Sequence, residues 1–202
     1  MLSQAVADLL KSEAKVSALS QGSLAIKRHS LHSNYSQEVP RTITGLHLIA
    51  YFGVKAVVKL LLETGQVEID SKDECSRTPL SYAAENRHEG IVKLLLKTDK
   101  VEINSKAKYS QTPLLFVVQN GHEAIVKLLL ETGKVEIDSK NWDSRTPLFY
   151  ATENGHEAIV KLLLEISKIK IDSKDWYGRT PLSYAVENRH EAIIKLLRKY
   201  IN

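Results

Sequence analysis

The chain has 202 residues, of which 43% are hydrophobic and 6% aromatic, and it carries a formal net charge of +4. Its 28 basic residues are mixed with 24 acidic ones and form no basic block, which argues against a nucleic-acid partner because phosphate binding needs clustered lysine and arginine. The single cysteine, Cys75, excludes an intramolecular disulfide and favours an intracellular protein of the cytoplasm or the nucleus.

Residues 1–43 differ from the rest of the chain, which repeats every 34 residues from Thr44 onward. Within them, residues 2–19 place leucine and valine at helical spacing and predict one amphipathic helix or two short ones. A stacked array needs a terminal element that covers the apolar side of its first repeat. We therefore interpret residues 1–43 as an N-terminal helical cap or a divergent repeat.

Five threonines at a constant spacing of 34 residues mark the repeat: Thr44, Thr78, Thr112, Thr146 and Thr180. A fixed period of this length predicts one supersecondary unit that buries its apolar face only by stacking on its neighbours. We expect an all-α solenoid of stacked helix-turn-helix units joined by hairpin-like connectors. The predicted repeats are residues 44–77, 78–111, 112–145, 146–179 and 180–202, and the last of them is expected to close the array as a C-terminal cap.

Each repeat from Thr78 onward has the same order of signals. The threonine can cap a helix with its hydroxyl, and proline follows at the first helical position, where its missing N–H costs nothing. The short first helix ends at a turn that suits Gly121 and Gly155, because glycine adopts positive φ freely, and a leucine-rich second helix follows. Arg87 and Arg189 occupy the same turn position in two other repeats, where we expect a local cost on the order of 1 kcal/mol.

The second helix is followed by a connector such as residues 133–145. It alternates apolar Val135 and Ile137 with polar neighbours, as an extended segment entering a turn does. We expect the tip of each connector to project as a hairpin-like finger. The predicted fingers carry Tyr109, Trp142, Trp176 and Tyr177, which include both tryptophans of the chain.

The TPL start, the two helices and the finger resemble the ankyrin repeat, whose signature begins T-P-L-H-x-A and whose usual period is 33. The resemblance covers about 160 residues and implies a solenoid that binds a protein through a concave groove and its finger tips. The signature histidine is present only as His47, and we expect Ser81 and Ser183 to offer a shorter substitute for its hydrogen bonds. The stretch YSQEVPRTITGLHLIAYFG is also similar to the start of ankyrin arrays in fungal NACHT-type multidomain proteins, which implies a recognition role in an intracellular sensor.

No set of residues indicates an enzyme, a cofactor or a metal site. The histidines that recur at the repeat period are too far apart to share one zinc ion, because helices stack about 8–10 Å apart, so we expect them to be structural. They are His88, His122, His156 and His190. His29 and His32 have no third ligand nearby, and Cys75 has no partner histidine nearby in the sequence. Glutamate and lysine pairs four residues apart on the second helices, such as Glu123 and Lys127, are typical of a solvated face.

One group of residues remains as a candidate binding surface. A stripe along the first helices combines aromatic side chains with acidic or amide side chains three positions later, and in the ankyrin family this stripe lines the groove. Its members are Tyr82 with Glu85, Phe116 with Gln119, Tyr150 with Glu153, and Tyr184 with Glu187. Together with Tyr109, Trp142, Trp176 and Tyr177 of the fingers, these residues have the composition that protein interfaces favour. In the alternative interpretation, the tyrosines pack between adjacent first helices with their hydroxyls in water.

We expect a monomeric, non-enzymatic scaffold without cofactors that binds an unidentified protein or peptide. A function of a different class stays open, in which single-stranded nucleic acid stacks on the same rings with the help of the finger lysines. Those lysines are Lys106, Lys108, Lys140 and Lys174. A third hypothesis is a spacing element, in which ring substitutions change only stability. We expect no membrane contact, because the sequence has neither a signal-peptide pattern nor a run of about 18 apolar residues.

Overall fold

The computed structural model describes residues 43–201 apart from residues 66, 167 and 168, and these residues form paired α-helices with no β-strand. The pairs are α3 (Gly45–Phe52) with α4 (Lys55–Thr64), α5 (Pro79–Glu85) with α6 (Glu89–Leu96), α7 (Pro113–Gln119) with α8 (Glu123–Glu131), α9 (Pro147–Glu153) with α10 (Glu157–Leu164), and α11 (Pro181–Glu187) with α12 (Glu191–Ile201). A short 3-10 turn, η1 (Lys108–Ser110), precedes α7. All but the last residue of the predicted cap lies outside the described residues, as do His29 and His32.

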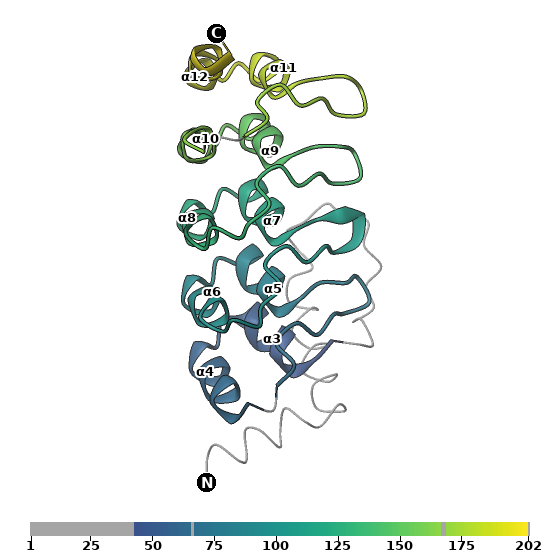
Figure 1. Cartoon of the computed structure of the whole chain (residues 1–202), viewed down its shortest axis with the longest axis vertical. Helices are drawn as coiled ribbons and strands as arrows, with labels where there is room; N and C mark the ends of the chain where they lie inside the picture. The colour runs from purple at the N-terminus through teal and green to yellow at the C-terminus, as the bar shows by residue number, and fades with distance from the viewer. Residues whose placement is uncertain (1–42, 66, 167–168, 202) are drawn as a thin grey trace, which may run out of the picture. The chain divides into compact units, whose positions relative to one another are not determined.

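The chain divides into two compact units between Val101 and Glu102. The N-terminal unit contains α3 to α6, and the C-terminal unit contains η1 and α7 to α12 (Figure 1). Within each unit, first helices pack on first helices and second helices on second helices: α3 contacts α5 and α4 contacts α6, while α9 contacts α7 and α11, and α10 contacts α8 and α12. The predicted all-α fold class of stacked helical pairs is therefore confirmed.

From α5 onward, each first helix begins with a threonine at the N-cap and a proline at the first helical position. In α5, α7 and α11 the hydroxyl of the capping threonine accepts a hydrogen bond from the amide three residues later, at 3.3 Å in each case. Thr146, before α9, is the exception, and the predicted hydroxyl cap is wrong there. The Phe149 amide donates instead to the Thr146 backbone oxygen at 3.0 Å, and the buried Thr146 hydroxyl has no hydrogen-bond partner among the described residues.

His47, the one residue that matches the histidine of the repeat signature, makes both a local and a distant hydrogen bond. Its Nδ1 accepts from the Thr44 amide at 3.1 Å, and its Nε2 donates to the Arg77 backbone oxygen at 2.9 Å, at the start of the next helical pair. Of the two serines expected to substitute for it, Ser183 reproduces the local bond, because its hydroxyl accepts from the Thr180 amide at 3.0 Å, whereas the Ser81 hydroxyl bonds to the Thr78 hydroxyl at 3.2 Å. Burial lowers the pKa of His47, which is fully inaccessible to solvent.

The turn inside each helical pair places one residue at positive φ. Gly121 and Gly155 have φ of 72° and 73°, as predicted, and the two arginines at this position have the same conformation. Arg87 has φ of 62° and Arg189 has φ of 58°. The predicted strain at these arginines therefore has a structural basis, because a side chain with a Cβ is disfavoured at such angles.

Three of the four periodic histidines connect neighbouring helical pairs, and their role is structural, as the sequence predicts. Through Nε2, His88 donates to the Tyr51 backbone oxygen at 2.8 Å, His156 to that of Gln119 at 3.3 Å, and His190 to that of Glu153 at 3.1 Å. The His190 ring lies so close to the preceding turn that a Cβ on Gly155 would be 2.8 Å from its Cε1. At Gly155, glycine is thus favoured both by its φ and by the close approach of the next histidine.

The second helices have one buried and one solvated face. The buried side chains of α8 are Ile125, Val126 and Leu129. On the opposite face Glu123 pairs with Lys127 and Glu157 pairs with Lys161, each at 2.5 Å and each well exposed. Because such pairs contribute only roughly 0.2–0.5 kcal/mol each, burial of the apolar face stabilises these short helices. None of the helices in the described part of the chain is long and apolar enough to cross a membrane.

Candidate functional site at the finger tips

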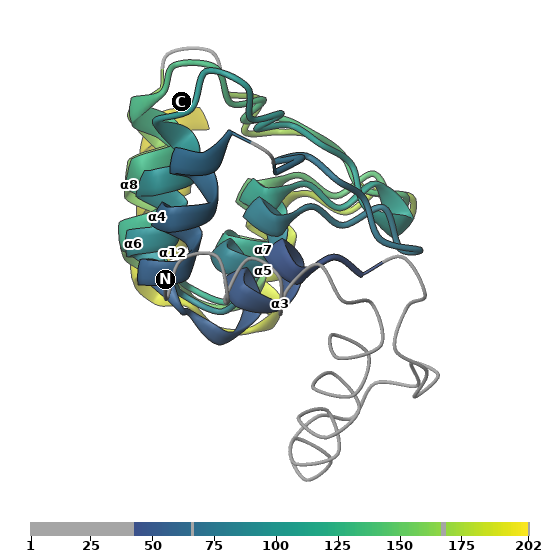
Figure 2. The ribbon, with the colours of Figure 1, turned by 90° about the horizontal axis from the view of Figure 1, so that it is seen from below.

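The connector tips, here called fingers, project beyond the first helices on the side away from the second helices (Figure 2). They are residues 71–77 (first finger), 105–111 (second), 139–145 (third) and 173–179 (fourth). In each finger the amide of the third residue donates to the carbonyl oxygen of the seventh, at 2.8–3.1 Å. The sixth residue of each finger has positive φ. The fingers are therefore closed loops with the expected hairpin-like form, although no β-strand is present in them.

The third residue of a finger determines whether the finger is bonded to the first helix that follows. In three fingers an aspartate or asparagine at this position bonds the hydroxyl of a tyrosine nine residues later, in what we call the finger–helix bond. The Tyr82 hydroxyl donates to Asp73 at 2.6 Å, the Tyr184 hydroxyl donates to Asp175 at 2.7 Å, and Asn141 donates to the Tyr150 hydroxyl at 2.9 Å. All three tyrosines are buried. Since an unpaired buried hydroxyl costs about 1–3 kcal/mol, each bond removes a substantial penalty.

The same acidic or amide side chain also holds the loop of its finger. One carboxylate oxygen of Asp175 accepts from the Tyr177 and Arg179 amides, both at 2.9 Å, while the other accepts from Tyr184. Asn141 likewise accepts from the Arg145 amide at 2.9 Å. A single side chain thus connects the backbone of the finger to the following first helix.

The seventh residue of the same three fingers is an arginine that pairs with a glutamate eight residues later. Arg77 pairs with Glu85, Arg145 with Glu153 at 3.2 Å, and Arg179 with Glu187 at 3.9 Å. The guanidinium groups also lie over the buried rings, at 4.3 Å between Arg77 Cζ and the centre of Tyr82 and at 4.4 Å between Arg179 Cζ and the centre of Tyr184. The glutamates of the predicted stripe therefore neutralise finger arginines.

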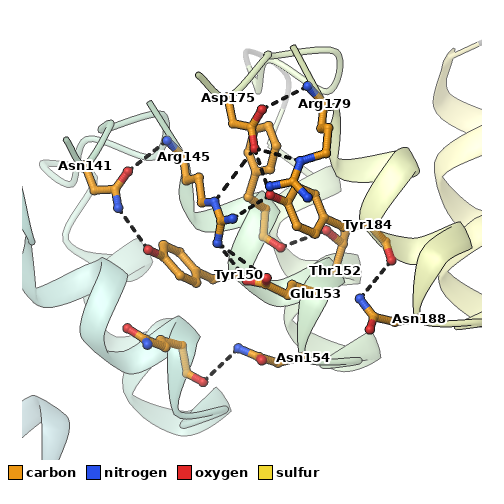
Figure 3. Close-up of polar contacts among 12 residues, drawn as sticks. Asn141, Arg145, Tyr150, Thr152, Glu153, Asn154, Asp175, Arg179, Tyr184 and Asn188 are labelled. Atoms are coloured by element: carbon orange, nitrogen blue, oxygen red, sulfur yellow. Dashed lines mark hydrogen bonds and ion pairs between the residues drawn. The ribbon is translucent and has the colours of Figure 1, made fainter. Parts of the chain in front are cut away.

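In the C-terminal unit these contacts join the third finger to the fourth (Figure 3). Arg145 of the third finger donates through Nη2 to the Tyr184 hydroxyl at 2.5 Å, and its Nε lies 3.9 Å from the Asp175 carboxylate. Arg179 of the fourth finger reaches the same carboxylate at 3.3 Å. Asp175 is thus satisfied by a hydroxyl, two amides and the charge of two arginines, as a buried carboxylate must be.

The protonation of this cluster follows from its contacts. Burial and the hydrogen bond to Asp175 raise the pKa of Tyr184 to about 12. Burial also acts to raise the pKa of Asp175, but the hydrogen bonds from Tyr184 and from the loop amides, together with the Arg179 charge, outweigh it and leave that pKa below its ordinary value. At neutral pH the tyrosine is therefore protonated and the aspartate ionised, which is the combination that the finger–helix bond requires.

The second finger, and the helix α7 that follows it, lack every member of this arrangement. Ala107 replaces the third residue and Gln111 the arginine, while Phe116 stands where the other helices have tyrosine. Gln119 replaces the glutamate. Phe116 has no hydroxyl that would need an acidic or amide partner at position 107. Gln119 has no charge that would need an arginine at position 111. The polar partners have changed together, as expected when each is useful only in the presence of the other.

The finger tips of the C-terminal unit carry a contiguous row of exposed rings. Tyr109, Trp142 and Trp176 form this aromatic row and are 44%, 54% and 68% exposed. Ring centres are 5.8 Å apart between Tyr109 and Trp142 and 5.6 Å apart between Trp142 and Trp176, with the planes tilted by 45° and 58°. The rings therefore contact one another while each still presents a large apolar surface to solvent. Tyr177, next to Trp176, is 76% exposed and lies 5.0 Å from Arg179 Cζ.

The twelve residues of the predicted surface thus have three different environments. Tyr82, Tyr150 and Tyr184 are buried, so the expected exposure of this part of the stripe is wrong. Burial is what the alternative interpretation requires, but the hydroxyls are bonded to the fingers and not to water. Glu85, Glu153 and Glu187 pair with finger arginines. Tyr109, Trp142, Trp176, Tyr177 and Gln119 are exposed, and Phe116 is partly exposed. That these residues contact a partner stays a prediction.

Sequence reasoning overlooked the residues that hold the fingers. Asp73, Asn141 and Asp175 were not singled out, although the sequence contains a signal for them: the one finger with alanine at this position is followed by phenylalanine instead of tyrosine. Among the described residues, no group of three or more histidine, cysteine, aspartate or glutamate side chains could hold a metal ion. The lone thiol of Cys75 is partly exposed in the first finger.

Comparison with known proteins identifies the architecture. A family model described as ankyrin repeats (3 copies) matches residues 15–107, 99–175 and 134–202. A search of curated proteins found no match. The matched segments together cover most of the chain and include every helical pair described above. The chain therefore belongs to the ankyrin repeat family.

Proposed function

We propose that this chain is a non-enzymatic scaffold that binds a protein or peptide through the finger tips of its C-terminal unit. Ankyrin repeats generally mediate protein–protein interactions, and the proteins that contain them are generally non-enzymatic. The observation that carries the proposal is the aromatic row, three contacting rings that are each 44% exposed or more. A role as the recognition part of an intracellular sensor rests on the sequence resemblance alone.

The aromatic row has the properties of an interface centre. Tryptophan and tyrosine are the residues whose removal most often costs binding energy at protein interfaces, because they bury a large area with few rotatable bonds. An exposed group of such rings has no evident role in the fold, whereas the buried tyrosines do. The proposal therefore assigns binding to the row and support to Tyr82, Tyr150 and Tyr184.

The alternative of single-stranded nucleic acid fits the ring geometry less well. A base that stacks between two aromatic side chains needs a gap of two stacking distances between their rings. The ring centres of the row are only 5.6 and 5.8 Å apart and the rings contact each other, so no such gap exists between them. A base could cover only an outer ring face. Protein side chains, which pack on tilted and irregular surfaces, have no such requirement.

Affinity capture from an extract of the source cells tests the proposal. The full chain is compared with the double variant Trp142→Ala and Trp176→Ala, which should lose its captured proteins. Tyr200→Ala is the matched control, because Tyr200 is also 44% exposed but lies on α12, outside the row. A double variant that captures every protein bound by the unchanged chain would contradict the proposal. Tyr150→Ala is unsuitable for this purpose, because Tyr150 is buried.

A further inference from the structure

Two kinds of contact join neighbouring fingers of the C-terminal unit. One kind is a backbone hydrogen bond. The Trp142 amide donates to the Tyr109 backbone oxygen at 3.0 Å, which joins the third finger to the second, and the Trp176 amide donates to the Asp143 backbone oxygen at 3.1 Å, which joins the fourth finger to the third. The other kind uses side chains, and there the two junctions differ.

Arg145 makes the side-chain contacts between the third and fourth fingers (Figure 3). Its guanidinium lies 2.5 Å from the Tyr184 hydroxyl and 3.9 Å from the Asp175 carboxylate, and it pairs with Glu153 at 3.2 Å. Its Cζ lies 4.9 Å from the centre of the Tyr184 ring. Because a guanidinium presents its N–H groups in a rigid planar fork, contacts to several partners at once fix the positions of the residues that they join.

The junction between the second and third fingers contains no such charge pair. Gln111 stands at the position of Arg145, and Asn141 stands at the position of Asp175. Both side chains are neutral, and charge-assisted hydrogen bonds are roughly twice as strong as neutral ones. We therefore expect the fourth finger to be held to the third more firmly than the third is held to the second.

The two tryptophans of the aromatic row lie next to the residues of the firmer junction. Trp142 precedes Arg145 by three residues, and Trp176 directly follows Asp175. The tryptophan ring centres are 5.6 Å apart, and the ring planes are tilted by 58°. The pairing of Arg145 with Asp175 therefore acts on the two short stretches of backbone that carry these rings. Without it, the two finger tips would be joined chiefly by the single bond between the Trp176 amide and the Asp143 backbone oxygen.

We propose, on the basis of the binding function above, that Arg145 is a positioning residue. It fixes the relative orientation of Trp142 and Trp176, and the partner binds the pair in that orientation. The Arg145 side chain is only 18% exposed, so it acts from below the row, whereas the rings form the contact surface. A pair that is oriented before the partner arrives loses little conformational entropy on binding, so loosening the pair lowers the affinity.

Circular dichroism tests the positioning role, because the two tryptophans of the row are the only ones in the chain. Two indole rings held in contact at a fixed tilt couple their electronic transitions and give two far-ultraviolet bands of opposite sign. Trp142→Phe and Trp176→Phe should each abolish this couplet, which assigns it to the pair. Arg145→Gln should weaken the couplet strongly and leave the helical signal in place. The variant should fold, because Asp175 keeps its bonds to two loop amides.

Two control variants keep the pairing of Arg145 with Asp175 and should keep the couplet. Glu153→Gln removes the ion pair that Arg145 forms with α9 but leaves its contacts to the fourth finger. Tyr184→Phe removes one hydrogen bond, but the ring below the guanidinium and the Asp175 carboxylate both remain. A couplet that is lost equally in these variants and in Arg145→Gln would assign the effect to general loosening and overturn the proposal.

Two further variants match the change of charge. Arg179→Gln removes the equivalent arginine of the fourth finger, whose contacts described above lie within that finger and α11, so the couplet should remain. Arg145→Gln with Glu153→Gln reproduces Gln111 and Gln119, which occupy these two positions one repeat earlier. This double variant leaves no glutamate without its arginine, and it should still weaken the couplet.

Capture from the cell extract measures the binding part of the proposal. Arg145→Gln should capture less of each protein than the unchanged chain at a temperature where both are folded. The proposal is overturned if the unchanged chain gives no couplet, if Arg145→Gln leaves the couplet unchanged, or if a weakened couplet accompanies full capture. None of these results contradicts the binding function itself, which is contradicted when Trp142→Ala with Trp176→Ala still captures every protein.

Discussion

The aromatic residues of the C-terminal unit form two groups with opposite environments. Tyr150 and Tyr184 on the first helices are 7% and 3% exposed, whereas Trp142 and Trp176 on the fingers are 54% and 68% exposed. Both groups recur with the period of the repeat, so periodicity does not distinguish them. The difference lies in the partner: each buried tyrosine has an asparagine or aspartate nine residues earlier, and the exposed rings contact one another. The place of a ring in the repeat determines whether it lies on a finger or on a first helix. The polar partner nine residues earlier is what allows the tyrosine hydroxyl to be buried.

The first finger shows the same separation in a different unit. It has the finger–helix bond between Asp73 and Tyr82, but its residues 71–77 contain no aromatic ring and equal numbers of acidic and basic side chains. The presence of a finger–helix bond and the presence of exposed aromatic rings are therefore independent features of a finger. We expect substitutions to affect one without the other.

The largest effect should follow removal of a buried ring. Tyr184→Ala should lower the free energy of unfolding by about 3–5 kcal/mol, because it leaves a cavity and removes a partner of buried Asp175. Tyr184→Phe keeps the ring and should cost only about 1–3 kcal/mol. Urea denaturation followed by circular dichroism measures both changes. Equal losses for the two variants would mean that packing of the ring contributes nothing beyond its hydroxyl.

A smaller loss is expected at the turn that meets the next histidine. Gly155→Ala introduces a Cβ at φ of 73° and 2.8 Å from the His190 ring, whereas Gly133→Ala has φ of 64° and nothing within 4 Å. Gly133→Ala should therefore cost about 1–2 kcal/mol and Gly155→Ala at least about 1 kcal/mol more. Thermal unfolding of the two variants compares them, and equal costs would argue against the histidine contact.

The finger–helix bond should make stability fall at alkaline pH. An unfolded tyrosine loses its proton near pH 10, but Tyr184 in the fold keeps it until about pH 12. Its contribution to stability is therefore complete below pH 10 and is lost as the pH rises through that interval. Unfolding free energies measured across this range should decline less for Tyr184→Phe than for the unchanged chain. An identical decline in both proteins would assign the pH dependence to other groups.

A gain of about 1 kcal/mol should follow the introduction of the missing bond into the second finger. Ala107→Asn with Phe116→Tyr recreates the pair that Asn141 and Tyr150 form in the third finger. Each single substitution should be neutral or unfavourable, because it adds a polar group without its partner. A double-mutant cycle in urea measures the coupling, and strictly additive effects would show that the second finger cannot form the bond.

The smallest effect on stability is expected at the aromatic row. Trp142→Ala removes contacts with two neighbouring rings, but the Trp142 side chain is not part of the core. The substitution should therefore lower the free energy of unfolding by about 1 kcal/mol or less. A loss as large as that of Tyr184→Ala would show that the row is part of the packing. Urea denaturation followed by circular dichroism distinguishes these two outcomes.

Much of the fold follows from the sequence, because threonine, proline and glycine act locally. The helix starts at Thr78, Thr112 and Thr180 and the positive φ of Arg87 and Arg189 are all determined by residues close in the chain. The bonds between the tyrosine hydroxyls and the fingers do not follow from local patterns, because the partners lie nine residues away, across the end of a finger. Thr146 differs from the other capping threonines for a local reason, because the Phe149 amide bonds to the Thr146 backbone oxygen instead of the hydroxyl.

The exposure of the finger rings was anticipated, because a tight loop can bury little of a large side chain. Their contact with one another was not, since it depends on how neighbouring fingers are joined. The backbone bond from Trp142 to Tyr109 connects residues of different repeats, and no local pattern contains that information.

The central claim is that the exposed rings bind the partner whereas the buried tyrosines stabilise the fold. It is tested most directly by measuring both protein capture and stability for two double variants. Trp142→Ala with Trp176→Ala should lose the proteins captured from cell extract while keeping nearly the stability of the unchanged chain. Tyr150→Phe with Tyr184→Phe should unfold more easily and yet capture the same proteins at a temperature where it is folded. Retained capture by the tryptophan variant, with capture lost by the folded tyrosine variant, would contradict the account.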